Sequence, residues 1–247
     1  MPARSAQHRP SHRNAKLARV VESSGKTVWL AGASGMVGSR VLEALLQAPE
    51  FVRILAITRR PLGRDSQRLA NRIVLFGQLE AQLRGQACDL ALCCLGASYK
   101  EAGSEAAYRE AAQTCVLAYA RAAHAAGARR FVMLSCCSAD SQSRNTAARV
   151  QGETLDALTA MKFESLDILV PGPLLGMRRG AGLGQLLSMI GVVMVRPLQL
   201  GAAESRRGIG ATQVASAMIG AARSGRRGIY RYEFSGIQSL SRMRGRT

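Results

Sequence analysis

Short apolar runs alternate with longer stretches of helical periodicity through the first two thirds of the chain. The run Ile54–Ile57 is apolar at every position, which is typical of a strand buried on both faces of a parallel sheet. Apolar runs of this kind predict strands at 27–31, 51–57, 71–76, 89–95, 130–135 and 165–170. Helical periodicity and end signals predict helices at 36–48, 79–83, 104–126 and 146–161. Strands that alternate with helices imply βαβ units, so the pattern predicts an α/β fold with a doubly wound parallel sheet.

The chain divides into three segments by composition. Residues 1–25 are basic and lack periodicity, and we expect them to form a disordered arm. Residues 26–173 hold the alternating strands and helices and form the main predicted domain. Residues 174–247 are predicted to be a small C-terminal lobe that completes the same fold and ends in a basic tail. Within that lobe we expect an apolar core or lid helix at 186–195, a helix near 212–222 and a strand near 228–234.

The net charge of +18 at pH 7 is concentrated at the two ends of the chain. Neither end interleaves aromatic with basic residues, so neither resembles a stacking platform for nucleic acid. Two interpretations stay open, namely solvated tails or a weak non-specific attraction to an anionic partner. No apolar run reaches the length of a membrane span, and the first residues lack the apolar core of a secretory signal. We therefore expect no membrane span and a cytoplasmic location.

The six cysteines show no metal-binding or redox spacing. Two adjacent pairs occur, but neighbouring strand residues point to opposite faces and do not readily bridge. We expect reduced, mostly structural thiols and no metal site.

The stretch AGASGMVG at 31–38 lies between the first predicted strand and the first predicted helix. Gly32 permits the tight turn out of the strand, Gly35 lets a pyrophosphate approach the backbone, and Gly38 lets the helix pack closely. The N-terminus of the helix then faces the phosphates. The spacing Gly-x-x-Gly-x-x-Gly differs from the dehydrogenase pattern, and a turn without a ligand is the alternative. In its strand-to-helix context the motif predicts a Rossmann-like dinucleotide site.

Further stretches carry a resemblance to a known family. They are AGASGMVGSRVLEALL, AITRRPL, DLALCCLGASYKEAGS, ARRFVMLSCCSAD, RVQGE and PGPLLGMRRG, in that order along the chain. With them the chain resembles the atypical branch of the short-chain dehydrogenase/reductase superfamily, and more narrowly the NAD(P)H-binding proteins related to the Tat-interacting-protein oxidoreductases. The resemblance implies a Rossmann fold, NAD(P)H binding, and reductase chemistry through a serine and a Tyr-x-x-x-Lys pair.

The end of the second predicted strand favours NADP(H) over NAD(H). An NAD binder places a carboxylate there for the ribose 2′-OH, whereas this chain has Arg59 and Arg60. A guanidinium can instead pair with the 2′-phosphate of NADP. The expected cofactor-binding residues are Gly32, Ser34, Gly35, Met36, Val37, Gly38, Arg59, Arg60, Leu95, Gly96, Ala97, Gln151 and Pro171.

The catalytic residues implied by the resemblance are only partly present. Ser135 matches the family serine, but Ala147 and Gln151 stand where the family has tyrosine and lysine. Alanine has no proton to give and glutamine has no charge, so the usual general acid, which contributes about 10²–10⁴-fold to the rate, is missing. Tyr99 with Lys100, or the thiols of Cys136 and Cys137, follow strands at the ligand-binding edge and are alternative proton donors.

Three functions stay open at this point. The first is an NADP(H)-binding protein that lacks the usual proton relay and acts as a cofactor-dependent sensor or binding module. The second is an active oxidoreductase with a substitute proton donor and an unknown small-molecule substrate. The third is a basic interaction protein whose cofactor site is vestigial. The arginines and intact glycines favour the first two, and the lost tyrosine and lysine favour the first.

Overall fold

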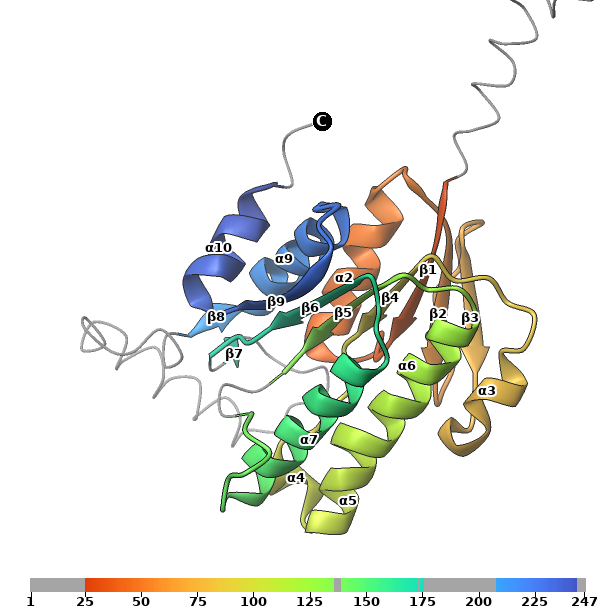
Figure 1. The fold of residues 1–247 in the computed structure, drawn as a ribbon. Helices are drawn as coiled ribbons and strands as arrows, with labels where there is room; N and C mark the ends of the chain where they lie inside the picture. Colours follow the sequence, from red (N-terminus) through yellow and green to blue (C-terminus); the bar gives the residue numbers. More distant parts are fainter. Residues whose placement is uncertain (1–24, 136–138, 173, 176–207, 244–247) are drawn as a thin grey trace, which may run out of the picture.

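The computed structural model describes residues 25–135, 139–172, 174–175 and 208–243. Its centre is a seven-stranded sheet in which every neighbouring pair of strands is parallel (Figure 1). The strand order is β3-β2-β1-β4-β5-β6-β9, so the chain reverses its direction of winding between β1 and β4. This order confirms the predicted doubly wound Rossmann-like fold. In such sheets ligands bind at the carboxyl ends of the strands beside the reversal point.

The strands are β1 (Lys26–Ala31), β2 (Phe51–Thr58), β3 (Leu69–Ile73), β4 (Leu90–Cys93), β5 (Arg130–Leu134), β6 (Ser165–Leu169) and β9 (Gly228–Tyr232). Two short strands, β7 (Leu174–Leu175) and β8 (Ile209–Gly210), pair separately. Helices cover both faces of the large sheet (Figure 1). One face carries α2 (Met36–Gln47), α9 (Ala211–Arg223) and α10 (Phe234–Arg242). The other carries α3 (Leu79–Gln82), α6 (Cys115–Ala125) and α7 (Thr146–Ala160), with α4 (Tyr99–Ala102) and α5 (Glu105–Arg109) beyond them.

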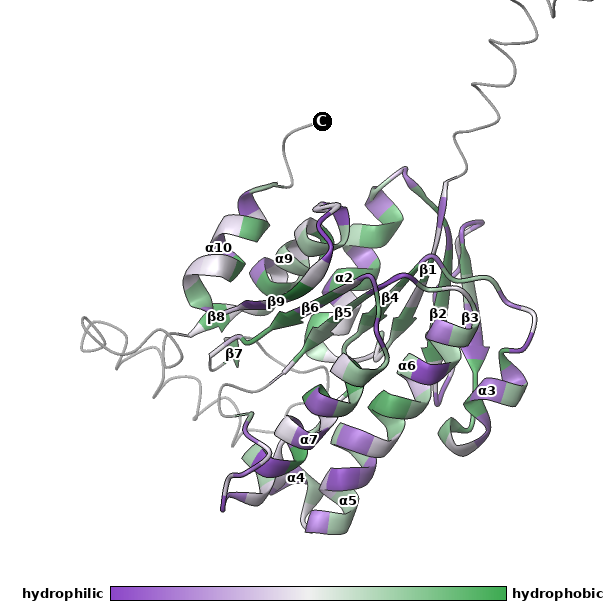
Figure 2. Ribbon diagram, in the orientation of Figure 1, coloured by the Kyte–Doolittle hydropathy of each residue, from purple (hydrophilic) through white to green (hydrophobic). Residues whose placement is uncertain are grey.

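The central strands are apolar because both of their faces are covered. In β1, Val28 and Leu30 pack in the core beneath α2 and α9, whereas Trp29 and Ala31 pack in the core beneath α6. All four side chains are fully buried. Figure 2 shows the same contrast, with hydrophobic strands inside and hydrophilic positions on the outer faces of the helices. The absence of polar alternation in these strands therefore follows from their position between two layers.

The long helix predicted at 104–126 is divided in the structure. A π-helical turn, η2 (Glu110–Thr114), separates α5 from α6. The buried residues Tyr108, Ala112 and Val116 are spaced four apart, and in a regular α-helix this spacing drifts around the axis. A π turn is wider than an α-helical turn and changes this spacing. Tyr108 and Ala112 pack with Val150, whereas Val116 packs in the core beneath α6. The sequence pattern could not show this interruption, since every position is compatible with a helix.

The C-terminal part adds β9 to the edge of the sheet and packs α9 and α10 on one face. Helix α10 was not predicted, although its buried Ile237 and Leu240 have helical spacing. The proposed division of the chain near residue 173 stays a prediction. The predicted basic arm and the apolar segment at 186–195 lie outside the described residues.

A buried carboxylate joins β6 to β9. Asp167 is fully buried; its Oδ2 accepts a hydrogen bond from Ser165 Oγ at 2.7 Å and its Oδ1 accepts one from Tyr232 OH at 2.9 Å. Arg226 donates to the same tyrosine hydroxyl at 2.6 Å. Hydrogen-bond donors therefore compensate for the burial of this charged group.

Candidate functional site

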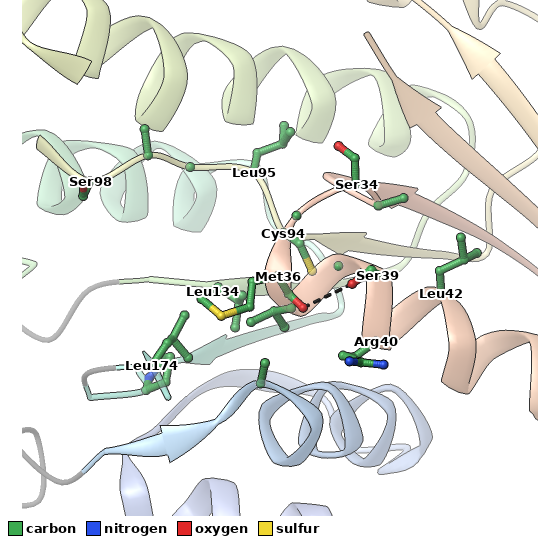
Figure 3. A pocket seen from close by; sticks show the side chains of 18 of the residues that line it. Ser34, Met36, Ser39, Arg40, Leu42, Cys94, Leu95, Ser98, Leu134 and Leu174 are labelled. Carbon is green, nitrogen blue, oxygen red and sulfur yellow. Dashed lines mark hydrogen bonds between the residues drawn. The ribbon is translucent and has the colours of Figure 1, made fainter. Parts of the chain in front are cut away.

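A cavity of about 1120 Å³ opens at the carboxyl ends of β1 and β4. Its walls come from the glycine turn and α2, from the segments after β4, β5 and β6, and from the start of α9. Figure 3 shows Ser34 beside Leu95, with Ser98 further along the same wall, while Met36 reaches toward Leu134 and Leu174 lies across from Leu95 and Ser98. Of the residues expected to bind a cofactor, the lining contains Ser34, Gly35, Met36, Val37, Gly38, Leu95, Gly96, Ala97, Gln151 and Pro171.

The three glycines of the turn meet different steric demands. Gly32 has a φ of +81°, and a Cβ there would lie 2.5 Å from the carbonyl oxygen of Cys94. A Cβ at Gly38 would fall well under 3.0 Å from the carbonyl oxygen of Gly32. A Cβ at Gly35 would lie 3.3 Å from the same oxygen, so its neighbours could adjust to a methyl group. Gly32 and Gly38 therefore make the turn possible, whereas Gly35 leaves its cavity-facing side open.

The N-terminus of α2 faces the cavity. Gly35 is the N-cap, and its N–H bonds to the Gly32 carbonyl at 3.0 Å. The first regular helical bond to the cap is from the Ser39 N–H to the Gly35 carbonyl, at 2.9 Å. The earlier N–H groups of a helix have no intrahelical acceptor, and the first turn of this fully described helix carries no acidic side chain. The geometry suits an anion such as a pyrophosphate.

Arginines also border the cavity, but they are not the pair predicted from the sequence. Among the described residues the lining includes Arg40 and Arg64, and neither Arg59 nor Arg60. Glu43 bonds both lining arginines, to Arg40 at 2.9 Å and to Arg64 at 3.2 Å. The hydrogen bond from Arg40 is the largest factor that lowers the pKa of the Glu43 carboxyl. Two cations share one carboxylate here, so this edge keeps a net positive charge.

An asparagine on β3 organises the turn that follows β2. Asn71 Nδ2 donates to the carbonyl of Ala56 at 3.1 Å and to Thr58 Oγ1 at 2.7 Å, while its Oδ1 accepts from the Leu62 N–H at 2.9 Å. The sequence analysis did not predict a role for Asn71, because the sequence around a single asparagine in a strand does not show which groups its side chain hydrogen-bonds. It holds the start of the loop that carries Arg64.

The structure brings Ser135 and Gln151, both predicted from the sequence, together with the hydroxyl of Tyr108. Ser135 Oγ donates to Gln151 Oε1 at 3.1 Å, and Gln151 Nε2 donates to Tyr108 OH at 3.3 Å. All three residues line the cavity. Ala147 packs against the small apolar cluster around Tyr108. The sequence did not indicate Tyr108, since it lies on a different helix from the expected tyrosine position.

The substitute proton donors considered from the sequence have different surroundings. Tyr99 is 41% exposed and meets the ring of Tyr108 edge-on, with the centroids 5.3 Å apart. Cys94 was not among these candidates, but its thiol lines the cavity, and burial is the main cause that raises its pKa well above the ordinary value, so it stays protonated. Cys136 and Cys137 lie outside the described residues.

Among the described residues no group of histidine, cysteine, aspartate and glutamate could hold a metal ion. None of the described helices combines the length and apolarity needed to cross a membrane.

Comparison with known proteins gives three findings. Residues 28–155 match the model of the NAD dependent epimerase/dehydratase family. The chain is 30% identical over 177 residues to Protein HTATIP2 of Rattus norvegicus, covering 70% of this chain and 73% of that protein. It is also 30% identical over 158 residues to the mitochondrial protein fmp52 of Emericella nidulans, with 61% and 68% covered.

Solved structures share the fold at low sequence identity. MoeE5 in complex with UDP-glucose and NAD has a TM-score of 0.63 at 14% identity, with 88% of this chain and 81% of that chain covered. The Bordetella bronchiseptica enzyme WbmH in complex with NAD⁺ has a TM-score of 0.61 at 16% identity, with 84% and 76% covered. At these identities the likeness supports the fold alone.

The comparisons correct the predicted location. The cytoplasm was expected by default, because the first residues lack the apolar core of a secretory signal and no apolar run reaches the length of a membrane span. That prediction is wrong, because several fungal relatives, including those of Emericella nidulans and Aspergillus fumigatus, carry the name of a mitochondrial protein. The prediction of a cytoplasmic location was wrong because this fold is compatible with the cytoplasm and with mitochondria, so the fold does not predict the compartment.

Proposed function

Because the chain belongs to the NAD dependent epimerase/dehydratase family and is homologous to HTATIP2, we propose that its cavity binds a nicotinamide dinucleotide, with NADP(H) preferred. The observation that carries this proposal is the glycine turn. No side chain fits at Gly32 or Gly38, and Gly35 places no side chain between the backbone and the cavity. The N-terminus of α2 points into the same cavity. A turn of this shape accommodates a pyrophosphate against the backbone.

The rest of the lining fits a molecule extended across the carboxyl ends of the strands. The pyrophosphate would lie against Gly35 and the first turn of α2. The nicotinamide end would lie toward Ser135 and Gln151, where a bound cofactor would supply or accept hydride. At the opposite end, Leu62 and Arg64 border the space for the adenosine. Gly35 precedes α2, Ser135 directly follows β5, Gln151 lies on α7, and Leu62 and Arg64 lie in the loop after β2.

Preference for NADP(H) rests on positive charge at the adenosine end. Arg40 and Arg64 line the cavity, while Arg59 and Arg60 are exposed at the end of β2. A charge-assisted hydrogen bond contributes about 1.5–3 kcal/mol, which corresponds to roughly ten- to a hundredfold in affinity. We expect the lining pair to contribute more than the exposed pair, since Glu43 already orients both guanidinium groups toward this edge.

The test compares two double variants with the parent protein. NADPH and NADH affinities are measured by titration for Arg40→Ala with Arg64→Ala, and for Arg59→Ala with Arg60→Ala. Replacement of the lining pair should reduce the preference for NADPH over NADH by about tenfold or more. The affinity for NADH should change little. The proposal of an NADP preference fails if the parent protein binds both cofactors equally.

The family relay is missing from this site. Ala147 lies on α7 where the relay needs a phenol, and Gln151 replaces the ammonium, so hydride transfer cannot use that pair. We propose a cofactor-binding protein that functions without this relay. A second candidate, an oxidoreductase with a different proton donor, is favoured by one observation: hydrogen bonds connect Ser135 through Gln151 to the hydroxyl of Tyr108 beside the cavity.

A further inference from the structure

We propose that Glu43 holds Arg40 and Arg64 in the way that the 2′-phosphate of NADP(H) would hold them, and that this phosphate displaces the carboxylate when it binds. Glu43 is then a specificity-determining residue, because its negative charge opposes the binding of NADP(H) and leaves that of NAD(H) almost unchanged. This inference rests on the proposed binding of a nicotinamide dinucleotide in the cavity.

One carboxylate bridges two arginines that come from separate segments of the chain. Glu43 and Arg40 lie on α2, three residues apart, whereas Arg64 lies in the loop between β2 and β3. Glu43 Oε2 accepts a hydrogen bond from Arg40 Nη1 at 2.9 Å, and Glu43 Oε1 accepts one from Arg64 Nη2 at 3.2 Å. The two guanidinium groups are therefore close enough for the oxygens of a single anion to reach both.

The bridge lies in the part of the cavity wall where the adenosine ribose of a dinucleotide is expected. Glu43, Arg40 and Arg64 all line the cavity. Arg40 lies two residues after Gly38 on α2, and Arg64 follows β2, the strand whose end recognises the ribose 2′ position in Rossmann folds. A phosphate accepts charge-assisted hydrogen bonds from guanidinium groups as a carboxylate does. A 2′-phosphate at this place can therefore accept the bonds that Glu43 accepts.

The carboxylate can leave the arginines at little cost. The Glu43 side chain is 33% exposed, and those of Arg40 and Arg64 are 51% and 41% exposed. Glu43 can therefore turn into water without leaving a buried and unpaired charge, which would be expensive. The exchange of one bridging anion for another also requires no additional donor, since the Nη atoms released by the carboxylate are the ones that the phosphate needs.

Two effects of Glu43 on NADP(H) binding have opposite signs. The carboxylate orients the two guanidinium groups, but exposed ion pairs of this kind contribute little. It also repels a phosphate monoester, which carries about −1.5 to −2 charges at pH 7, from a distance at which salt screens only in part. The repulsion is the larger effect because the phosphate carries more than one charge. NAD(H) has a neutral hydroxyl at the 2′ position, so it experiences neither the exchange nor the repulsion.

The experiment compares Glu43→Gln with Glu80→Gln. Both variants remove one negative charge from an exposed ion pair and keep the shape of the side chain, but Glu80 pairs with Arg121 outside the cavity lining. Calorimetric titration measures the affinities for NADPH, for NADH, and for adenosine 2′,5′-bisphosphate and adenosine 5′-monophosphate. These two fragments differ only in the 2′-phosphate and report binding without any turnover. Glu43→Asp, which shortens the side chain and keeps its charge, separates the effect of charge from that of orientation.

We expect Glu43→Gln to raise the affinities for NADPH and for adenosine 2′,5′-bisphosphate by about three- to tenfold. Its affinities for NADH and adenosine 5′-monophosphate should stay within about twofold of the parent, since glutamine can still accept a hydrogen bond from a ribose hydroxyl. Glu80→Gln and Glu43→Asp should keep all four affinities within about twofold of the parent. The inference is overturned if Glu43→Gln leaves NADPH affinity unchanged or lowers it, or if it raises NADH affinity equally. A parent protein that binds neither dinucleotide would contradict the proposed function itself.

Discussion

Replacement of Gly38 by alanine tests the steric account of the glycine turn. The new Cβ would lie well under 3.0 Å from the carbonyl oxygen of Gly32, and near the Gly32 carbonyl carbon as well. Ordinary contact begins at 3.4 Å, so α2 and the end of β1 would have to separate by roughly 1 Å. Overpacking of this kind costs about 1–3 kcal/mol. Because the obstructing atoms belong to the backbone, we expect the upper end of that range.

A loss of about 3 kcal/mol should lower the Tm by roughly 6–12 °C for a chain of this length. Two matched glycine variants separate folding from binding. Gly77→Ala places its Cβ where nothing lies within 4 Å, and the Tm should stay the same or rise slightly. Gly35→Ala requires a shift of only a few tenths of an ångström, so the protein should fold while its methyl group blocks the phosphate.

The assay is thermal unfolding followed by NADPH titration of each variant at a temperature where it is folded. Gly38→Ala should lose stability, whereas Gly35→Ala should keep the parent's Tm and lose at least tenfold in affinity. An unchanged unfolding temperature for Gly38→Ala would contradict the steric role of Gly38, and NADPH binding by Gly35→Ala as tight as that of the parent would contradict the phosphate contact at Gly35.

Three further predictions concern side-chain hydrogen bonds in the structure around the cavity. Tyr232→Phe removes a hydrogen-bond donor from the buried Asp167 carboxylate and should lower the free energy of unfolding by about 1–3 kcal/mol in denaturant titrations; an unchanged midpoint would contradict that role. Asn71→Ala should loosen the loop after β2 and speed tryptic cleavage at its arginines in the native protein, and an unchanged cleavage rate would contradict the hydrogen-bond assignment. The hydrogen bond from Arg109 lowers the pKa of Glu153, so its stabilisation is present above the unfolded pKa of about 4.3 and is lost as the pH falls through the lower folded value. In Glu153→Gln, the Tm should therefore fall less steeply than in the parent as the pH is lowered. The same dependence of Tm on acid pH in both proteins would exclude a contribution from this pair.

Much of the sheet could be predicted because its signals are local. Fully apolar runs such as Ile54–Ile57 reflect burial on both faces, and the glycine spacing reflects backbone contacts within a few residues. The fold class, the parallel sheet and most strand positions followed from these patterns. Helix α10 was missed because it is short and its buried positions are few.

The site was less predictable because its contacts join distant segments. Ser135 directly follows β5, Gln151 lies on α7 and Tyr108 lies on α5. Nothing in the sequence around Tyr108 indicates that its hydroxyl reaches Gln151. The arginines that line the cavity could not be predicted for the same reason. Arg59 and Arg60 follow β2 directly, but the structure turns the chain so that Arg64 and the α2 residue Arg40 border the cavity.

Calorimetric titration of the unmodified protein with NADPH, and separately with NADH, measures directly whether the cavity binds a dinucleotide. The account predicts saturable binding of one NADPH per chain with a Kd in the micromolar range or below, about −8 kcal/mol or stronger, and binding of NADH that is weaker by about tenfold or more. Absence of binding by both dinucleotides would contradict the assignment of the cavity, whatever the activity of the protein toward other ligands.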